Sequence, residues 1–320
     1  MNRKHATPFL GLETMIPNVL LSYYYYKTKK ITEIFRDCGV SEYNVLVDSG
    51  AFTVYTLGKE ININDYADWV FENKAINYVN LDALGNAEET LRNQKKLEEI
   101  GLNPIPVFHQ SEDFKYLDYY LDNYGYLCIS GSVDSRQQVV SKWMDKCFDK
   151  IYCKNITPKI HGLGIASQHL IKRFPFYSVD SSSWKSGVRF GVIKIFNPDT
   201  GIIVGTNITD RLFFENEFEL FKKHYLINSI EFYNNIMEDH IGHSDILTMI
   251  GAKSHILLCE YYNNIFGRVF DGTHMYLADA RPSSYGYLIS GCRAFDEIEY
   301  KPNKQRDFRN HESLQLELGF

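Results

Sequence analysis

The amino-acid sequence predicts an α/β protein built on a parallel sheet, and three observations predict it. Short apolar runs typical of strands alternate with segments of helical period, the order expected of a parallel sheet. Each strand run is apolar along its length and becomes polar at its carboxyl end, where barrel enzymes carry their functional loops. No glycine-rich phosphate-binding turn follows the first strand, which disfavours the second possibility, an open doubly wound sheet. The expected fold is a TIM-type (β/α)8 barrel with a β-hairpin insertion and a helical C-terminal appendage.

Four strand–helix units are expected first. Their strands are at 44–47, 76–81, 104–108 and 126–129. The helices that follow them are at 64–73, 87–100, 114–123 and 136–152. Apolar residues recur on one side of each helix at helical spacing, as Tyr66, Trp69 and Val70 do in the first, which indicates packing against a sheet.

The second half of the chain continues this order and then departs from it. A further strand and its loop are expected within 159–167, then a short helix through Phe174, and then the strand that ends at Asp180. Two β-rich runs at about 189–205 flank the turn Asn197-Pro198-Asp199-Thr200, which predicts a hairpin. Amphipathic stretches at 209–237 and 244–265 place a helical part at about 209–300. The barrel motifs then occupy about 44–191, a basic tail 301–320, and the whole chain one domain.

Composition limits the environment and the partners. The chain has 320 residues, of which 44% are hydrophobic and 23% charged, as in soluble globular proteins. Its apolar runs are too short to span a bilayer, and no signal-type apolar core follows the charged N-terminus. The six cysteines show no framework spacing, so reduced thiols in a cytoplasmic protein are expected. A net charge of −6 means that any binding of nucleic acid must depend on local basic patches.

The stretch Tyr177-Ser178-Val179-Asp180-Ser181-Ser182-Ser183-Trp184 is the first candidate for chemistry. A short apolar run ends in Asp180, at the position where barrel enzymes keep reacting groups. The structural alternative is that Asp180 only caps the serine-rich turn behind it. Asp48 and Asp82 end earlier strands in the same way, so the pieces fit one site.

Taken in order, these strand ends resemble the tRNA-guanine transglycosylases over about residues 44–191. Asp48-Ser49-Gly50-Ala51-Phe52 resembles the Asp-Ser-Gly-Gly-Phe motif of that family, with alanine at the second glycine. The later strand ends also follow the family's order: Asp82, His109-Gln110, Gly131, His161-Gly162-Leu163-Gly164 and Asp180. The fuller strings around Asp82, His109 and Asp180 are more similar still to the DNA-acting branch, whose members place 7-deazaguanines in DNA.

The resemblance implies a mechanism that the residues can also support independently. Asp180 would attack C1′ of a flipped-out nucleotide and form a covalent glycosyl-enzyme intermediate as the base departs. Asp48 would be the acid/base group, or a second carboxylate beside the sugar. Two carboxylates flanking one glycosidic bond are what such a double displacement requires.

The resemblance also implies residues that hold the base. Asp82 would read the base edge, Gln110 or the neighbouring His109 would recognise it, and the backbone of Gly131 would face it. The full set expected to bind the substrate base is Asp82, His109, Gln110, Gly131, Phe52, His161 and Gly162. Phe52, Phe108 and Trp184 are candidates for the aromatic wedge that holds the helix open. The structural alternatives are that His109 tethers a loop, that His161 orients the barrel wall and that Asp82 caps a helix.

Contacts with nucleic acid are expected just beyond the strand of Asp180. The candidates are Lys185, Arg189 and Trp184. Weaker ones are Lys194 and the basic tail with Lys301, Lys304, Arg306 and Arg309. The tRNA enzymes carry a zinc site of clustered cysteines and a histidine after this strand. Here only His255 and Cys259 share a helix face, so no metal and no cofactor are predicted.

Three functions are compatible with these residues. The first is base exchange in DNA, with a free 7-deazaguanine-type base as the second partner. The second is a hydrolytic DNA glycosylase that excises a base, modified or unmodified, and leaves an abasic site, for example in defence against phage. The third is a nucleic-acid-binding barrel without catalysis, which the presence of both Asp48 and Asp180 disfavours. No membrane partner is expected.

Overall fold

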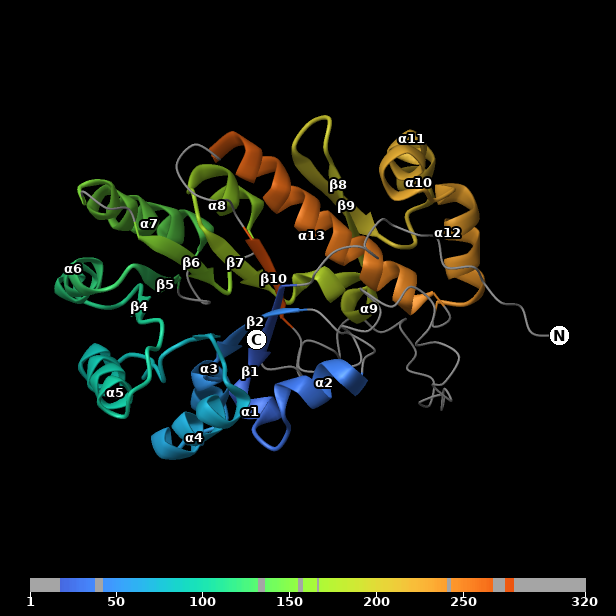
Figure 1. Cartoon of the computed structure of the whole chain (residues 1–320). Coiled ribbons are helices and arrows are strands. Elements are labelled where there is room, and N and C mark those ends of the chain that lie inside the picture. The colour runs from blue at the N-terminus through green and yellow to red at the C-terminus, as the bar shows by residue number, and fades with distance from the viewer. Residues whose placement is uncertain are drawn as a thin grey trace.

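Eight parallel strands, drawn from both ends of the described chain, form the main sheet of the computed structural model (Figure 1). The structure describes residues 18–37, 43–131, 136–154, 158–165, 167–240, 243–266 and 274–278. The strands are β1 (Asn18–Ser22), β2 (Asn44–Asp48), β3 (Asn77–Tyr78), β4 (Val107–His109), β5 (Tyr126–Ser130), β6 (Lys159–Leu163), β7 (Ser178–Ser181) and β10 (His274–Ala278). Their spatial order is β3-β2-β1-β10-β7-β6-β5-β4. An α/β fold with a parallel sheet is therefore confirmed.

The two edge strands of this sheet, β3 and β4, are joined at one point by the residues beside them. Val79 and Ile105 form an isolated parallel bridge. The Ile105 N–H donates to the Tyr78 carbonyl at 2.8 Å, and the Asn80 N–H donates to the Ile105 carbonyl at 2.8 Å. Backbone hydrogen bonds thus link the segment at β3 to the segment just before β4.

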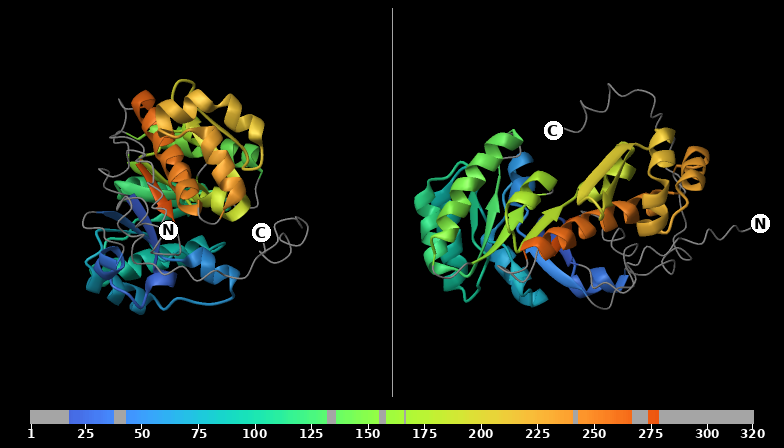
Figure 2. Two further views of the ribbon diagram at one scale, coloured as in Figure 1. Left: turned by 90° about the vertical axis from the view of Figure 1, so that its right-hand side faces the viewer. Right: turned by 90° about the horizontal axis from the view of Figure 1, so that it is seen from above.

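Helices follow most strands and cover one side of the sheet (Figure 2). The connecting helices are α2 (Ile31–Asp37), α4 (Ile63–Asn73), α5 (Ala87–Glu99), α6 (Phe114–Asn123), α7 (Gln137–Tyr152) and α8 (Gln168–Arg173). Three of them begin at a side-chain cap, because Asn62, Asn86 and Asp113 each accept a backbone N–H of the first turn. Two short helices, α1 (Tyr23–Tyr26) and α3 (Ala51–Thr56), begin where β1 and β2 end.

Successive residues of each strand face opposite sides of the sheet and enter two separate apolar clusters. The smaller one, here called the inner cluster, contains Leu20, Leu46, Val79, Ile105, Val107, Cys128 and Tyr276. The larger one, the outer cluster, takes the neighbouring strand residues and the buried faces of the helices, for example Val47, Phe108, Ile129, Leu117 and Met144. The parity of a strand residue therefore decides whether its side chain faces the helices or the inner side.

A long insertion separates β7 from β10. It contains η1 (Ser183–Lys185), α9 (Ser186–Phe190), the strands β8 (Val192–Asn197) and β9 (Ile202–Asn207), α10 (Arg211–Asn216), α11 (Phe218–Leu220), the π-helical turn η2 (Phe221–Tyr225), α12 (Ser229–Glu238) and α13 (Ser244–Phe266). Strands β8 and β9 pair antiparallel around the Pro198-Asp199 turn, so the predicted hairpin is confirmed. Figure 2 shows the hairpin and α10–α12 projecting beyond one end of the sheet, with α13 leading back.

The prediction that the chain is helical from about residue 209 to about residue 300 is wrong. Residues 274–278 form β10, which lies in the main sheet between β1 and β7. The hairpin and helices are therefore an insertion within the sheet, and the parallel strands extend from residue 18 to residue 278, beyond the expected 44–191. Strand β1 was not expected either. Both strands have five residues, of which only three in β1 and four in β10 are apolar, and a run this short becomes a strand by pairing with its neighbours rather than by its own pattern. The basic tail lies outside the described residues.

No helix within the described ranges is both long enough and apolar enough to cross a membrane.

Candidate active site

Four of the expected site residues lie on the inner side of the sheet, Asp48, His109 and Asp180 toward the carboxyl ends of their strands and His161 at the middle of β6. Asp48 is two residues beyond Leu46 of the inner cluster, and His109 is two beyond Val107. His161 pairs in register with Cys128, another inner residue. Asp180 shares its strand face with Ser178, whose hydroxyl contacts His161. Strand parity therefore directs these side chains toward one space.

Asp180 is held by partners from β6 and from the turn that follows it. Its Oδ1 accepts a hydrogen bond from the Gly164 N–H and lies 3.3 Å from His161 Nε2. On the other side of the ring, His161 Nδ1 is 2.7 Å from Ser178 Oγ, which is 2.8 Å from the Tyr126 hydroxyl. In the tautomer that carries its proton on Nε2, His161 donates to Asp180 Oδ1, so Nδ1 accepts from Ser178 and Ser178 accepts from Tyr126. The chain of hydrogen bonds then has one direction and ends at Asp180.

Asp48 sits at a turn that only glycine can complete. Gly50 has φ +83° where α3 begins, and its N–H donates to Asp48 Oδ2 at 3.0 Å. A Cβ on Gly50 would stand 2.5 Å from Tyr24 Cβ, so the close approach of α1 also requires glycine. Burial, followed by the charges of Asp82 and Asp180, raises the pKa of Asp48 to about 7 against the Gly50 hydrogen bond. A carboxyl group with this pKa can carry a proton near neutral pH.

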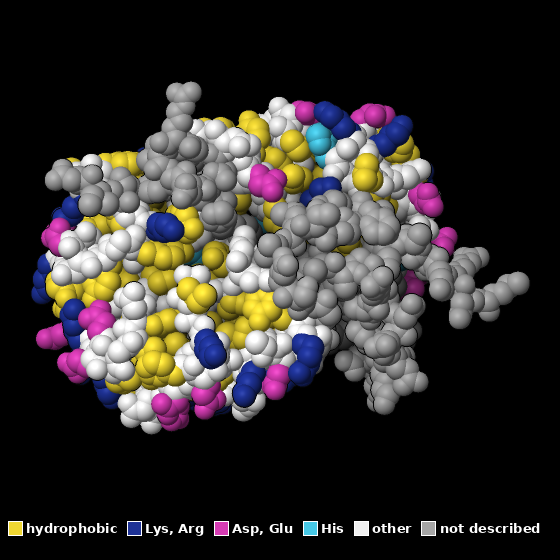
Figure 3. All heavy atoms as spheres, viewed as in Figure 1, with side chains coloured by type: hydrophobic (Ala, Val, Ile, Leu, Met, Phe, Trp, Pro, Cys, Tyr) yellow, Lys and Arg dark blue, Asp and Glu magenta, His cyan; other side chains and the backbone are white. Residues whose placement is uncertain are grey.

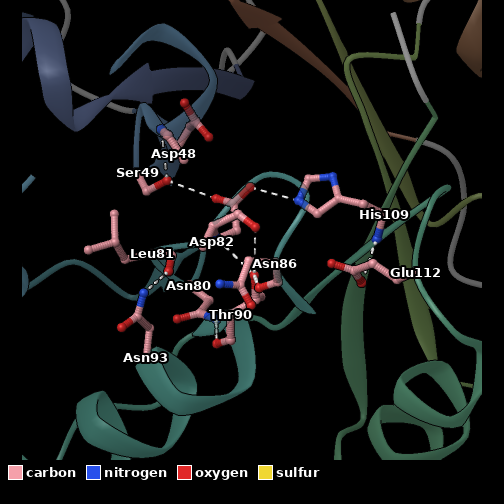
Figure 4. A network of polar contacts seen from close by, with 12 residues as sticks. Asp48, Ser49, Asn80, Leu81, Asp82, Asn86, Thr90, Asn93, His109 and Glu112 are labelled. Atoms are coloured by element: carbon pink, nitrogen blue, oxygen red, sulfur yellow. Dashed lines mark hydrogen bonds and ion pairs between the residues drawn. The ribbon is translucent and has the colours of Figure 1, made fainter. Parts of the chain in front are cut away.

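Asp82 lies in a polar network that Figure 4 shows at close range. Ser49 Oγ donates to its Oδ1 at 3.1 Å, and His109 Nε2 contacts its Oδ2 at 2.8 Å. Burial lowers the pKa of His109, but the hydrogen bond and charge of Asp82, with the charge of Glu112, outweigh burial and leave this pKa raised. The contact between His109 and Asp82 is buried and favours the protonated imidazole.

The loop that carries Asp82 is held independently of its carboxylate. The Ala83 N–H donates to Thr90 Oγ1 at 2.9 Å, and Asn86 Oδ1 accepts the Glu89 N–H as the cap of α5. The structural alternative that Asp82 caps this helix is therefore wrong. Its carboxylate faces Ser49 and His109 instead, which come from β2 and β4.

Cys128 of β5 lies on the inner side of the sheet, within electrostatic reach of the three carboxylates. Its side chain is fully buried in the inner cluster. Burial, followed by the charges of Asp180, Asp82 and Asp48, raises the pKa of its thiol well above the ordinary value. All three carboxylates therefore act electrostatically on this one thiol, and Asp82 and Asp180 also act on Asp48. The structure thus brings together the two expected catalytic aspartates and the expected base reader.

A side chain at Gly131 or Gly162 would lie on the outer side of the sheet, opposite to Asp48 and Asp180. A Cβ on Gly131 would lie 2.7 Å from Cγ1 of Val140 in α7, and one on Gly162 would lie 2.9 Å from Ile165 Cδ1. Helix and loop packing on the outer side therefore explain both glycines, and their side-chain positions point away from the expected base pocket. Gln110 is partly buried beside Gly131, with its N–H donating to the Ser130 carbonyl at 3.1 Å.

Two of the residues expected to contact nucleic acid are buried. Trp184 is 0% exposed and Lys185 is 4% exposed, because α13 covers them. A Cβ on Gly251 of α13 would stand 1.9 Å from the Trp184 carbonyl oxygen, so the helix packs directly on this turn. Lys185 lies near Asp245, whose pKa burial raises to about 6 against the charge of Lys185. The assignment of Trp184 and Lys185 to a nucleic-acid surface is wrong.

The remaining candidates divide by exposure. Arg189 is exposed, and Lys194 is partly buried in the hairpin. Phe108 is fully buried and stacks on Trp143 with ring centroids 5.8 Å apart, so it belongs to the outer cluster and cannot act as a wedge. Phe52 is 46% exposed on α3, directly after the Asp48 turn. Of the three aromatic wedge candidates, Phe52 alone is exposed.

The His255 and Cys259 pair is structural. His255 Nε2 lies 2.7 Å from Ser183 Oγ and its Nδ1 lies 2.7 Å from the Gly251 carbonyl, so both ring nitrogens are engaged. Burial lowers the pKa of His255 to about 4, which keeps the ring neutral. In the described part of the chain, no group of three or more His, Cys, Asp or Glu residues could hold a metal ion. Cys128, Cys147, Cys153 and Cys259 are free thiols.

Several contributors to the site were not expected from the sequence: Tyr126, Ser178, Gly164, Glu112 and Cys128. Strand parity would have found Ser178, because it lies two residues before Asp180 on the same face. It would equally have placed Gly131 and Gly162 on the outer face. The contact of Tyr126 with Ser178 joins β5 to β7 across β6, and no local pattern predicts such a pair.

No protein-family model and no curated protein sequence matches this chain.

Proposed function

We propose that this protein cleaves the N-glycosidic bond of a flipped-out nucleotide in DNA through a covalent intermediate on Asp180. The observation that carries the proposal is the pair Asp48 and Asp180, two carboxyl groups in unlike environments around one space. Oδ1 of Asp180 is occupied by Gly164 and His161, whereas Oδ2 accepts no hydrogen bond from the described residues. Asp48 has a pKa of about 7, as a proton donor at neutral pH requires.

The first half-reaction follows from these roles. Asp180 Oδ2 attacks C1′ of the deoxyribose, the bond from C1′ to the base nitrogen breaks, and its electron pair leaves with the base. Asp48 delivers its proton to the departing base. A nucleotide stacked in a duplex cannot present C1′ to these carboxylates, so the target must leave the helix.

The second half-reaction regenerates the enzyme. In exchange, a nitrogen of the incoming 7-deazaguanine-type base attacks C1′, its proton passes to Asp48, and the ester bond to Asp180 breaks. In hydrolysis, water takes the place of the incoming base and an abasic site remains. Exchange is the reaction that we propose. Hydrolysis by a DNA glycosylase uses the same residues and is the alternative.

Recognition of the base is assigned to Asp82, His109 and Gln110. Each carboxylate oxygen of Asp82 accepts one hydrogen bond from the protein and has a further lone pair for an N–H donor of a base. His109 holds the carboxylate in place from β4. Phe52, exposed beside Asp48, is the candidate wedge.

A closed (β/α)8 barrel is proposed as the frame of this site. The bridge between Val79 and Ile105 supports closure between β3 and β4. The inner cluster supports it too, because residues from strands in both halves of the sheet order pack together in it. Closure would set all eight strand ends around one mouth, where active sites of such barrels lie.

Mass spectrometry of nucleosides tests the reaction. Unmodified DNA and 7-deazaguanine-containing DNA are each incubated with the protein, with and without a free 7-deazaguanine base, and then digested. A new nucleoside that requires the added base supports exchange, and free base with abasic sites supports hydrolysis. Unchanged nucleosides in every reaction would contradict both and leave a non-catalytic binding barrel. Asp149→Asn, at an exposed position on α7, is the matched control for Asp180→Asn.

A further inference from the structure

We infer that an exposed aromatic and lysine surface beside the site binds single-stranded DNA. This surface, here called the aromatic platform, consists of Tyr24, Tyr25, Phe52, Tyr55, Lys27 and Lys59. That the nucleic acid is DNA rests on the proposed function. That it is single-stranded rests on the chemistry of the platform.

The platform lies at the carboxyl edge of the sheet, next to Asp48. Helix α1 begins directly after Ser22, the residue of β1 that pairs with Asp48 of β2. Helix α3 begins directly after the Asp48-Ser49-Gly50 turn, and Gly50 approaches Tyr24 so closely that a Cβ would collide with it. The two short helices therefore lie side by side at the edge that carries the carboxylates, as Figure 1 shows.

The aromatic side chains on these helices are unusually exposed. Tyr25 is 49%, Phe52 46% and Tyr55 66% exposed. Phe52 and Tyr55 are three residues apart and so share a face of α3, and the rings of Tyr24 and Tyr25 meet edge to face at 5.3 Å. Figure 3 shows apolar side chains between cationic ones over the region of α1, α3 and α4. Large aromatic side chains gathered at the surface indicate a binding site rather than a core.

Lysines surround the aromatic rings. Lys27 Nζ lies 5.7 Å and Lys59 Nζ 5.8 Å from the centroid of the Tyr24 ring, and Lys59 also donates to the Tyr24 hydroxyl at 3.2 Å. Over residues 22–33 and 50–60 there are four lysines against two glutamates, Glu33 and Glu60. These two segments therefore carry a formal charge of +2, although the chain as a whole carries −6.

Aromatic faces with lysines among them are the chemistry of single-strand binding. Each ring can stack on the face of an unpaired base, and each ammonium can contact a phosphate between bases. In a duplex these base faces are stacked on one another and cannot meet the rings. A single strand held here would also offer its nucleotides to Asp48 and Asp180 without the cost of unpairing.

Fluorescence anisotropy with a labelled single-stranded DNA oligonucleotide tests the platform. Tyr25→Ala/Tyr55→Ala should weaken binding of the single strand about tenfold or more, and should leave binding of the duplex of the same sequence unchanged. The matched control is Tyr152→Ala. Tyr152 is 56% exposed and ends α7, at the opposite edge of the sheet, so this variant should bind as the wild type does.

Salt dependence tests the lysines separately. Lys27→Ala/Lys59→Ala should reduce the slope of log affinity against log salt by about 0.7 for each phosphate that a lysine no longer neutralises. Lys142→Ala/Lys146→Ala, at exposed positions on α7, should not change the slope.

Three results would overturn the inference: unchanged affinity in the Tyr25→Ala/Tyr55→Ala variant, an equal loss on duplex and single strand, or tighter binding of RNA than of DNA of the same sequence. Binding requires no turnover, so the two proposals fail separately. A protein that binds single strands through the platform but leaves every nucleoside unchanged refutes glycosidic cleavage alone. A protein that turns over DNA, yet binds normally after Tyr25→Ala/Tyr55→Ala, refutes the platform alone.

Discussion

His161 Nε2 lies 3.3 Å from Oδ1 of Asp180, and the two residues come from neighbouring parallel strands. The ring cannot turn away without breaking its contact with Ser178 on the opposite nitrogen. The carboxylate of Asp180 is therefore oriented by β6 and by its own strand at once. A group that must attack one carbon atom benefits from such orientation.

Removal of the nucleophile should abolish the reaction. We expect Asp180→Asn to lower the rate of base release by roughly 10³-fold or more, because Asp180 supplies the oxygen that attacks C1′. Single-turnover assays by mass spectrometry measure the rate, and circular dichroism checks the fold. Near-native turnover by a well-folded variant would contradict the assignment.

Ser178 should act through His161 without touching substrate. We expect Ser178→Ala to lower kcat about tenfold and to leave KM unchanged, because the ring loses the hydrogen bond that sets its tautomer. The matched control is Ser181→Ala on the same strand, where the hydroxyl contacts Ser183 instead. If both variants change kcat equally, Ser178 is only structural.

Because the pKa of Asp48 is raised in the folded protein, its ionisation should lower the free energy of unfolding as pH rises. Its folded pKa of about 7 exceeds its ordinary value of 3.8, so folding favours the protonated carboxyl group. The folded state is therefore destabilised as pH rises from about 4 to about 7, and the penalty persists above pH 7. We expect Asp48→Asn to raise Tm at pH 8 and to leave it nearly unchanged at pH 4.

Thermal unfolding at the two pH values provides the measurement. Asp149→Asn removes an exposed carboxylate on α7 and should show no such difference. An equal effect of Asp48→Asn at both pH values would mean that Asp48 ionises normally. In the wild type, base release should also decline above pH 7, as the proton donor is lost.

Asp82 should affect the choice of base more than the affinity for DNA. We expect Asp82→Ala to reduce discrimination between substrates that differ only in the target base, because buried donors of the preferred base lose their acceptor. Thr90→Val removes a hydrogen bond that holds the same loop and should lower turnover on all bases alike. Equal losses on every base for Asp82→Ala would show that Asp82 supports the loop rather than reads the substrate.

The sequence by itself determined the α/β class, most helices and the strand ends that carry Asp48, Asp82, His109, His161 and Asp180. These features are local: strand and helix periods, caps such as Asn86 and Asp113, and polar residues at the carboxyl ends of apolar runs. The alternation along β5 and β6 was also present in the sequence and is enough to turn Gly131 and Gly162 outward.

Only the tertiary structure decided the rest. Strands β1 and β10 exist because each finds partners across the sheet, and β10 reaches its place after an insertion of nearly a hundred residues between β7 and itself. The sequence predicted Trp184 and Lys185 at the surface, but α13 packs over them and buries both. The pKa of Asp48 depends on burial and on charges from Asp82 and Asp180. Each of these features depends on contacts between residues distant in sequence. Local sequence patterns do not indicate which distant segments will pack together.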